Sequence, residues 1–210
     1  VDHGGFAIDR SIFVEDPPLQ TGRPSPYPID DELLQKFGTR DKLYINGRYY
    51  SDKSPVPAYY LAAVYWTARQ MGLPTAAERP DLFCTLMTLA SSGLTYVLAV
   101  VCLFSIARRL GLELRASLLL TLSFAAGTVA LAYAGYVNNH MMLLGVAMAA
   151  FRVLVVGGQD GWSILRLLAL GFWAGLAYTI DLGAGPPLCG LLLVYAVWKG
   201  TGWRRLLVVA

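Results

Sequence analysis

Residues 82–107 read LFCTLMTLASSGLTYVLAVVCLFSIA, a run without a charged residue, and Arg108-Arg109 follow it directly. An α-helix of about 20 apolar residues is long enough to cross the ~30 Å hydrocarbon core of a bilayer. A helix is the expected spanning form because the bilayer core offers no water to satisfy backbone polar groups. The run therefore predicts a transmembrane helix, and it decides the class of fold.

Four more apolar segments follow, at about 116–136, 139–157, 163–180 and 184–198, and another starts near 206. The 210-residue chain is 56% hydrophobic and 15% charged, whereas ordinary soluble domains are about 25% charged. Residues 1–81 hold 20 of the 31 acidic and basic residues. We expect an all-α, polytopic transmembrane bundle over 82–210, preceded by an extracytoplasmic loop region over 1–81. Intrinsic disorder and a disulfide-rich secreted scaffold are excluded.

The basic residues after position 81 follow an alternating pattern. All of them lie in or beside the loops at 108–115, 157–162 and 199–205, whereas the loops near 137–139 and 181–185 have none. Loops rich in Lys and Arg are typically cytoplasmic. The pattern predicts that the basic loops are cytoplasmic and that Asn138-Asn139 and Asp181 face the other side.

The segment at 55–73, PVPAYYLAAVYWTARQMGL, is barely long enough to span and contains Arg69. Its Tyr and Trp side chains favour the membrane interface. We therefore expect a helix that lies along the bilayer surface and leaves residues 1–54 outside the cytoplasm. The alternative is a crossing helix, which would place residues 1–54 in the cytoplasm.

Residues 1–54 are rich in proline and glycine, which predicts a structured loop with short elements. The acidic run at 30–32 favours the start of a short helix over 30–37. Asn46-Gly47 is a turn signal between two short runs of strand-forming residues, 43–45 and 48–50, as in a hairpin.

Two groups of polar residues stand out at the expected membrane surface. Lys53 ends the run NGRYYSDK, residues 46–53, where its ammonium suits a lipid phosphate. The alternative is a lysine that merely keeps its charge in interfacial water. Asn138-Asn139-His140 begin an apolar segment either as helix caps or as groups of a functional site. Asp181, at the same face, either orients a polar ligand or is a solvated loop residue.

Several classes of enzyme lack their motifs in this chain. There is no GxSxG, P-loop, HExxH or GxGxxG with the expected acidic residue. Cys84, Cys102 and Cys189 lie in apolar segments without metal-ligand spacing. No metal site is predicted.

The run GRYYSDKSP at 47–55, followed by an aromatic segment that ends in Tyr65-Trp66, resembles the GxxYSxKPP…YW segment of GT-C-type integral membrane glycosyltransferases. This superfamily includes the protein mannosyltransferases and the lipid A aminoarabinose transferases. Further similar motifs are Arg79-Pro80-Asp81, Ala107–Gly111, Ala126-Gly127-Thr128 leading to Asn138-Asn139-His140, and Gly175-Leu176-Ala177 leading to Asp181. The motifs are short, but they cover nearly the whole chain in a consistent order.

The resemblance implies an enzyme that moves a sugar from a polyprenyl-phosphate carrier to an acceptor at the extracytoplasmic face of a bacterial inner membrane. Its substrate-binding residues would be Lys53 at the lipid phosphate with Tyr49 and Tyr50 beside it. Asn139, His140 and Asp181 are further candidates at the same face. The expected partners are the bilayer, the lipid-linked donor and a lipid, glycan or protein acceptor, with no nucleic acid and no certain cofactor beyond the donor.

This chain departs from the family pattern in two respects. It has Lys53-Ser54-Pro55 where the family has KPP. The carboxylate that serves as general base in the family is expected upstream of Val1, so we expect a fragment that lacks this segment and the C-terminal part and is inactive alone. The competing hypothesis is a multi-pass transporter or permease, since Gly183–Pro187 is typical of a broken helix.

Overall fold

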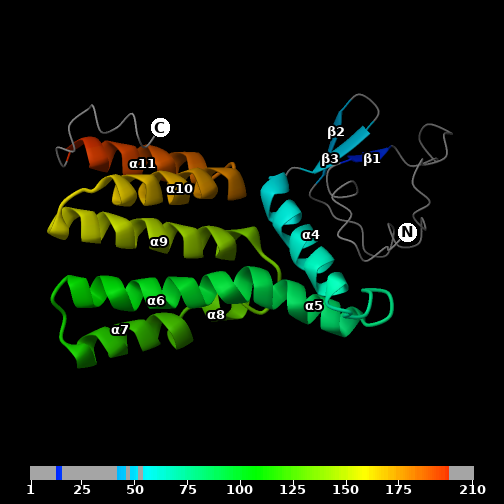
Figure 1. Ribbon diagram of the computed structural model, residues 1–210, viewed down its shortest axis with the longest axis horizontal. Helices are drawn as coiled ribbons and strands as arrows, with labels where there is room; N and C mark the ends of the chain where they lie inside the picture. The colour runs from blue at the N-terminus through cyan, green and yellow to red at the C-terminus, as the bar shows by residue number, and fades with distance from the viewer. Residues whose placement is uncertain (1–12, 16–41, 46–47, 52–53, 199–210) are drawn as a thin grey trace. The chain divides into compact units, whose positions relative to one another are not determined.

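The computed structural model describes residues 13–15, 42–45, 48–51 and 54–198, and their side chains from 54 to 195. The chain divides into two compact units, residues 1–81 and 82–210. Figure 1 shows the helices and strands of each unit with the labels used below. The expected helix at 30–37, Lys53 and the apolar start near 206 lie outside the described residues.

The first unit contains a small antiparallel sheet. Its strands are β1 (Phe13–Glu15), β2 (Lys42–Ile45) and β3 (Arg48–Ser51), in the order β1-β3-β2. Ile45 pairs with Arg48, and Lys42 with Ser51, which confirms the predicted pairing of these two short runs. The all-α class thus describes the helical unit 82–210, whereas the loop region adds this sheet.

The helix α4 (Pro55–Gln70) follows the sheet in the chain. The Oγ of Ser54 accepts a hydrogen bond from the backbone N–H of Val56 at 3.3 Å, and Pro55 suits the first helical position. The helix ends before Gly72, whose φ of +81° is a conformation that glycine adopts without strain. The predicted helix over 55–73 is confirmed with an earlier end, and its position in a bilayer stays a prediction.

The regular secondary structure in the described part of the second unit is helix, and short non-helical connections join the helices. Its elements are α5 (Pro80–Thr88, which starts at the end of the first unit), the π-helical turn η1 (Leu89–Gly93), α6 (Leu94–Arg109), α7 (Leu114–Gly127), α8 (Val129–Tyr133), α9 (Asn139–Asp160), α10 (Ile164–Ile180) and α11 (Gly185–Trp198). α5, η1 and α6 form one continuous helix. Each of the five apolar segments predicted between 82 and 198 therefore contains helix.

The helix expected over 116–136 is interrupted, so this expectation of one continuous span is wrong. Thr128 is extended, with φ −119° and ψ 162°. Its hydroxyl donates to the carbonyl of Phe124 at 2.7 Å and accepts from the N–H of Ala130 at 3.3 Å. The break arises because the threonine hydroxyl competes for backbone groups and Gly127, just before it, is a poor helix former.

Two helices in the described part of the chain are long and apolar enough to span a membrane. They are Pro80–Arg109 and Asn139–Asp160, each of which contains an 18-residue stretch with a mean hydropathy of 2.0. Leu114–Gly127, Ile164–Ile180 and Gly185–Tyr195 are apolar but shorter.

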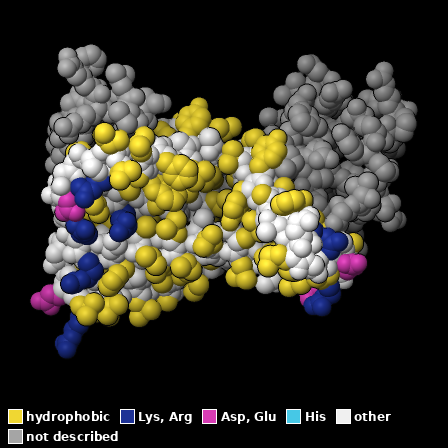
Figure 2. Space-filling model, viewed as in Figure 1, with side chains coloured by type: hydrophobic (Ala, Val, Ile, Leu, Met, Phe, Trp, Pro, Cys, Tyr) yellow, Lys and Arg dark blue, Asp and Glu magenta, His cyan; other side chains and the backbone are white. Residues whose placement is uncertain are grey.

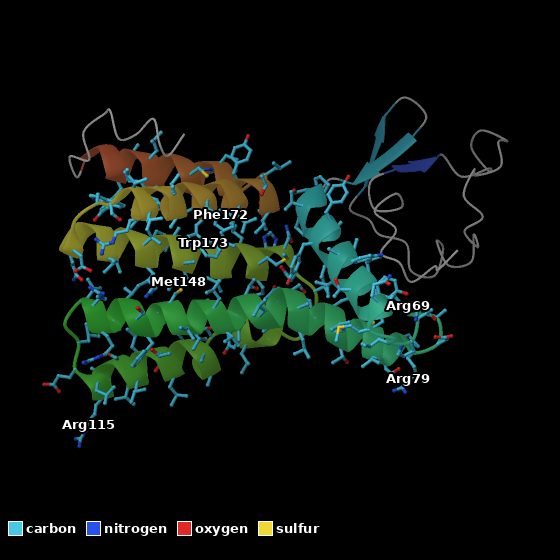
Figure 3. All side chains as sticks on the ribbon, in the orientation of Figure 1. Arg69, Arg79, Arg115, Met148, Phe172 and Trp173 are labelled. Carbon is cyan, nitrogen blue, oxygen red and sulfur yellow. The ribbon has the colours of Figure 1, made fainter. Side chains whose placement is uncertain are left out.

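The helix α9 lies between α6 and α10 in the second unit, α11 packs on α10, and α7 packs on α6 (Figure 1). Small residues allow the closest approach. A Cβ at Gly145 of α9 would lie 2.5 Å from the carbonyl oxygen of Thr95 in α6. On the other side of α9, Trp173 of α10 packs against two apolar clusters, of which one contains Val146 and the other Leu154 (Figure 3).

Charged side chains gather at one end of these helices (Figure 2). Asp160, at the end of α9, pairs with Arg109 at 2.9 Å and with Arg166 at 3.4 Å. Arg115 lies at the same end, at the start of α7 (Figure 3). The loops at 108–115 and 157–162 therefore meet at one end, and the loop at 199–205 lies outside the described residues.

Candidate functional site

Asp181 is the buried acidic residue at the opposite end of the second unit. Its side chain is 9% exposed, directly after the last residue of α10. Its Oδ1 accepts hydrogen bonds from the backbone N–H groups of Gly183 at 2.9 Å and Ala184 at 3.0 Å. These contacts organise the turn into α11. The alternative of a solvated loop residue is therefore wrong.

The turn needs glycine at its last position. A Cβ at Gly185 would lie 2.3 Å from the carbonyl oxygen of Ala177. The two helices α10 and α11 are consequently joined by a tight connection, with the backbone N–H of Gly185 donating to the carbonyl of Asp181 at 2.8 Å. Both the side chain and the backbone carbonyl of Asp181 therefore accept hydrogen bonds from this turn.

The second carboxylate oxygen of Asp181 faces the start of α9. Its Oδ2 lies 2.9 Å from Nδ1 of His140 and accepts from the side-chain amide of Asn139 at 3.4 Å. The His140 side chain is 69% exposed, in contrast to its buried partner. A buried carboxylate thus holds two polar side chains of α9, of which the imidazole reaches the surface.

The hydrogen bonds lower the pKa of the Asp181 carboxyl below its ordinary value. The N–H of Ala184 makes the largest contribution, and the N–H of Gly183 and the nearby His140 act in the same direction. Burial acts in the opposite direction, because it disfavours the charged form. Asp181 is therefore a stable carboxylate at neutral pH.

The start of α9 is set by Asn138 and Ser92. The Asn138 side chain accepts the N–H of His140 at 2.8 Å, which is the geometry of an N-cap. The backbone N–H of Asn138 donates in turn to the Oγ of Ser92 at 2.9 Å. Ser92 lies in η1 and is fully buried. Short π-helical segments of this kind often occur at functional sites.

The structure brings together Asn139, His140 and Asp181 of the predicted site residues. Of the three polar residues at 138–140, Asn138 is the cap, whereas Asn139 and His140 turn to Asp181. Tyr49 and Tyr50 lie in β3, opposite Tyr44 and Leu43 of β2. The shared site of these tyrosines and Lys53 with Asn139, His140 and Asp181 stays a prediction.

Sequence reasoning missed Ser92 and Gly185 as positioning residues. Ser91-Ser92-Gly93 interrupts an apolar run, and this was the available signal for a close contact. The contact of Ser92 with Asn138 joins residues 46 positions apart. In the region from 54 to 198, no group of three His, Cys, Asp or Glu residues could hold a metal ion.

No protein-family model, curated protein or solved structure matches this chain. Its function is therefore inferred from its own residues and their geometry.

Proposed function

We propose that the protein is an integral membrane glycosyltransferase that moves a sugar from a polyprenyl phosphate to an acceptor at the extracytoplasmic face of a bacterial inner membrane. The observation that supports it most is the buried carboxylate of Asp181, which holds the exposed imidazole of His140 and the amide of Asn139 at one end of an apolar helical unit. A lipid headgroup would be at the same level as these polar groups.

The surface of the second unit supports a multi-pass arrangement in the membrane. Large apolar side chains point outward from α6, α7, α10 and α11, where water would make such exposure costly (Figure 2). Examples are Leu94, Val97, Val101, Leu118, Leu119, Leu122, Leu165, Leu168, Phe172, Leu191 and Val194. Small residues such as Ala99, Ala150 and Ala177 are among its buried positions, as in membrane helix bundles.

The distribution of charge supports the proposed side of the site. Arg109, Arg115 and Arg166 lie at the end of the helices opposite Asp181, and the positive-inside rule assigns that end to the cytoplasm. The polar cluster then faces the extracytoplasmic side. A polyprenyl phosphate would present its sugar to the cluster from the outer leaflet.

The chemistry of glycosyl transfer matches the residue types available. An acceptor hydroxyl must lose its proton as it attacks the anomeric carbon, and the departing phosphate must be stabilised. His140 is a suitable proton acceptor, Asn139 is a neutral hydrogen-bonding group, and Lys53 is the candidate cation for the phosphate.

The interrupted α7–α8 segment favours a second candidate, a transporter, because transporters often bind solutes at broken helices. Against it, Asp181–Ala184 connects two neighbouring helices rather than interrupting one span. Solute uptake into proteoliposomes in the absence of a sugar donor would favour the transporter.

The experiment is sugar transfer by the full-length protein in liposomes, with a radiolabelled polyprenyl-phosphate sugar as donor. We expect Lys53→Ala to lower kcat/KM about 100-fold, the typical effect of removing one group that stabilises a transition-state anion. Lys42→Ala, in β2 of the same unit, is the matched control and should stay near the wild-type rate. Undiminished transfer by Lys53→Ala would contradict the assigned role of this lysine.

A further inference from the structure

The imidazole of His140 has a defined orientation in this site. Its Nδ1 lies 2.9 Å from Oδ2 of Asp181. An ionised carboxylate only accepts hydrogen bonds, so Nδ1 carries the proton of the neutral ring. The lone pair is then on Nε2, on the far side of a side chain that is 69% exposed. Within the described part of the chain, Nε2 has no hydrogen-bond partner.

Asp181 is itself held in place by hydrogen bonds, and this stabilises the orientation of the His140 imidazole. Two backbone N–H groups hold its Oδ1, at 2.9 Å from Gly183 and 3.0 Å from Ala184. Rotation of the carboxylate away from His140 would break both bonds in a site where the side chain is 9% exposed. A carboxylate that fixes the tautomer of a histidine is the arrangement used by many general bases.

We infer that His140, in place of the upstream carboxylate that the resemblance implies, is the catalytic general base of this site and that Asp181 is its positioning residue. This inference rests on the proposed glycosyl transfer. The O–H bond of the acceptor breaks, and its proton passes to Nε2 of His140. The acceptor oxygen forms a bond to the anomeric carbon, and the bond from that carbon to the phosphate oxygen breaks. The electron pair of this bond leaves with the polyprenyl phosphate, and the carboxylate of Asp181 stabilises the imidazolium.

The groups around the imidazole ring indicate that Asp181 determines its tautomer. The start of α9 contributes Asn138 and Asn139, and η1 contributes Ser92, all of which are uncharged. The turn from α10 to α11 contributes Asp181. Among the residues described with side chains, Asp181 is therefore the ionisable group that contacts His140.

The test is His140→Ala in the full-length protein, with sugar transfer measured in liposomes with and without added imidazole. We expect kcat to fall about 100- to 1,000-fold with little change in the donor KM, since general-base catalysis contributes factors of this size. Added imidazole should restore part of kcat because the exposed side chain leaves an accessible space. Lys53→Ala is the control that imidazole should not rescue.

Asp181→Asn tests the positioning role separately. The asparagine carbonyl can still accept from Gly183 and Ala184, but its NH₂ group then faces Nδ1 and favours the tautomer with the proton on Nε2. We expect a low kcat that imidazole does not restore. Nitrogen NMR of histidine-labelled protein reports the tautomer without turnover, and the signal lost in His140→Ala assigns the resonance.

The outcomes separate this inference from the proposed function. A kcat of His140→Ala equal to that of the wild type would overturn the role of His140. The proposed glycosyl transfer would then still stand. A raised donor KM without imidazole rescue, or a proton on Nε2 in the wild type, would also overturn it. Absence of transfer by the wild type would overturn the proposed function and the base assignment together.

Discussion

Ser92 and Asn138 are joined by a hydrogen bond across 46 residues, from the backbone N–H of Asn138 to the serine Oγ at 2.9 Å. The bond ties the π-helical turn η1 to the residue that caps α9. Because Ser92 is fully buried, water cannot easily replace its hydroxyl. The pair fixes where α9 begins, and His140 stands two residues further on.

Replacing Ser92 with alanine should therefore destabilise the helical unit. A buried backbone N–H that loses its acceptor costs about 1–3 kcal/mol. The free energy of unfolding in detergent micelles should fall by this amount, and the backbone amides at the start of α9 should exchange faster with deuterium. The matched control is Ser123→Ala on the exposed side of α7, which should change stability by less than about 0.5 kcal/mol. Equal effects of the two variants would refute the structural role of Ser92.

The close contact of Gly145 with Thr95 makes a second prediction. A Cβ at position 145 would meet the Thr95 carbonyl oxygen at 2.5 Å, so α6 and α9 must separate in Gly145→Ala. Overpacking of this kind costs about 1–3 kcal/mol, which thermal unfolding in detergent would measure.

Gly175 in α10 offers the matched control for this substitution. A Cβ there meets nothing within 4 Å, so the alanine is accommodated without a shift. Gly175→Ala should stabilise the helix by about 0.5–1 kcal/mol, since glycine loses more backbone freedom on folding. The two variants should thus move the unfolding midpoint in opposite directions, and a shift of both in the same direction would count against the α6–α9 contact.

The lowered pKa of Asp181 predicts a pH dependence of stability. The folded state holds this pKa below the ordinary value of 3.8, chiefly through the N–H of Ala184. The carboxylate therefore stabilises the fold fully above the unfolded pKa of about 4, and this contribution is lost as the pH falls further towards the folded pKa. The stability difference between wild type and Asp181→Asn should shrink between pH 5 and pH 3.

A His140→Gln background isolates this effect from the imidazole. The largest cause of the lowered pKa is the Ala184 N–H, which the substitution leaves in place. The pH dependence should consequently persist in this background, with unfolding followed in detergent at each pH. A difference between the aspartate and asparagine forms that is constant from pH 5 to pH 3 would contradict the assignment.

The helices of the second unit follow from the sequence because long apolar runs have few other stable forms. The start of α9 at Asn139 and the pairing of Lys42–Ile45 with Arg48–Ser51 carry local signals, a capping asparagine and a turn dipeptide. The break at Thr128 has a weaker signal, since threonine is tolerated in most helices. Local sequence patterns of this kind predict individual helices and strands, but not the contacts between them.

The candidate site depends on contacts that local patterns do not contain. Asp181 meets His140 because the end of α10 and the start of α9 reach the same level, which the packing of the two helices decides. Gly145 and Gly185 matter through the backbones that approach them. The polar residues at this end could be identified from the sequence. The residue that each of them contacts could be identified only from the packing of the helices.

The orientation of the two ends of the second unit is the last prediction. Ser163 follows the charged end of α9, near the Asp160–Arg166 pair, whereas Leu182 follows Asp181 at the opposite end and is 59% exposed. Cysteine at each position, in the full-length protein with its native cysteines replaced, should react with a membrane-impermeant maleimide from opposite sides. The positive-inside rule places position 163 in the cytoplasm and position 182 outside it. Intact cells should therefore label Leu182→Cys, and Ser163→Cys should react only after the membrane is opened. Labelling of both positions from one side would refute the crossing of α10, and the reversed pattern would place His140 and Asp181 in the cytoplasm.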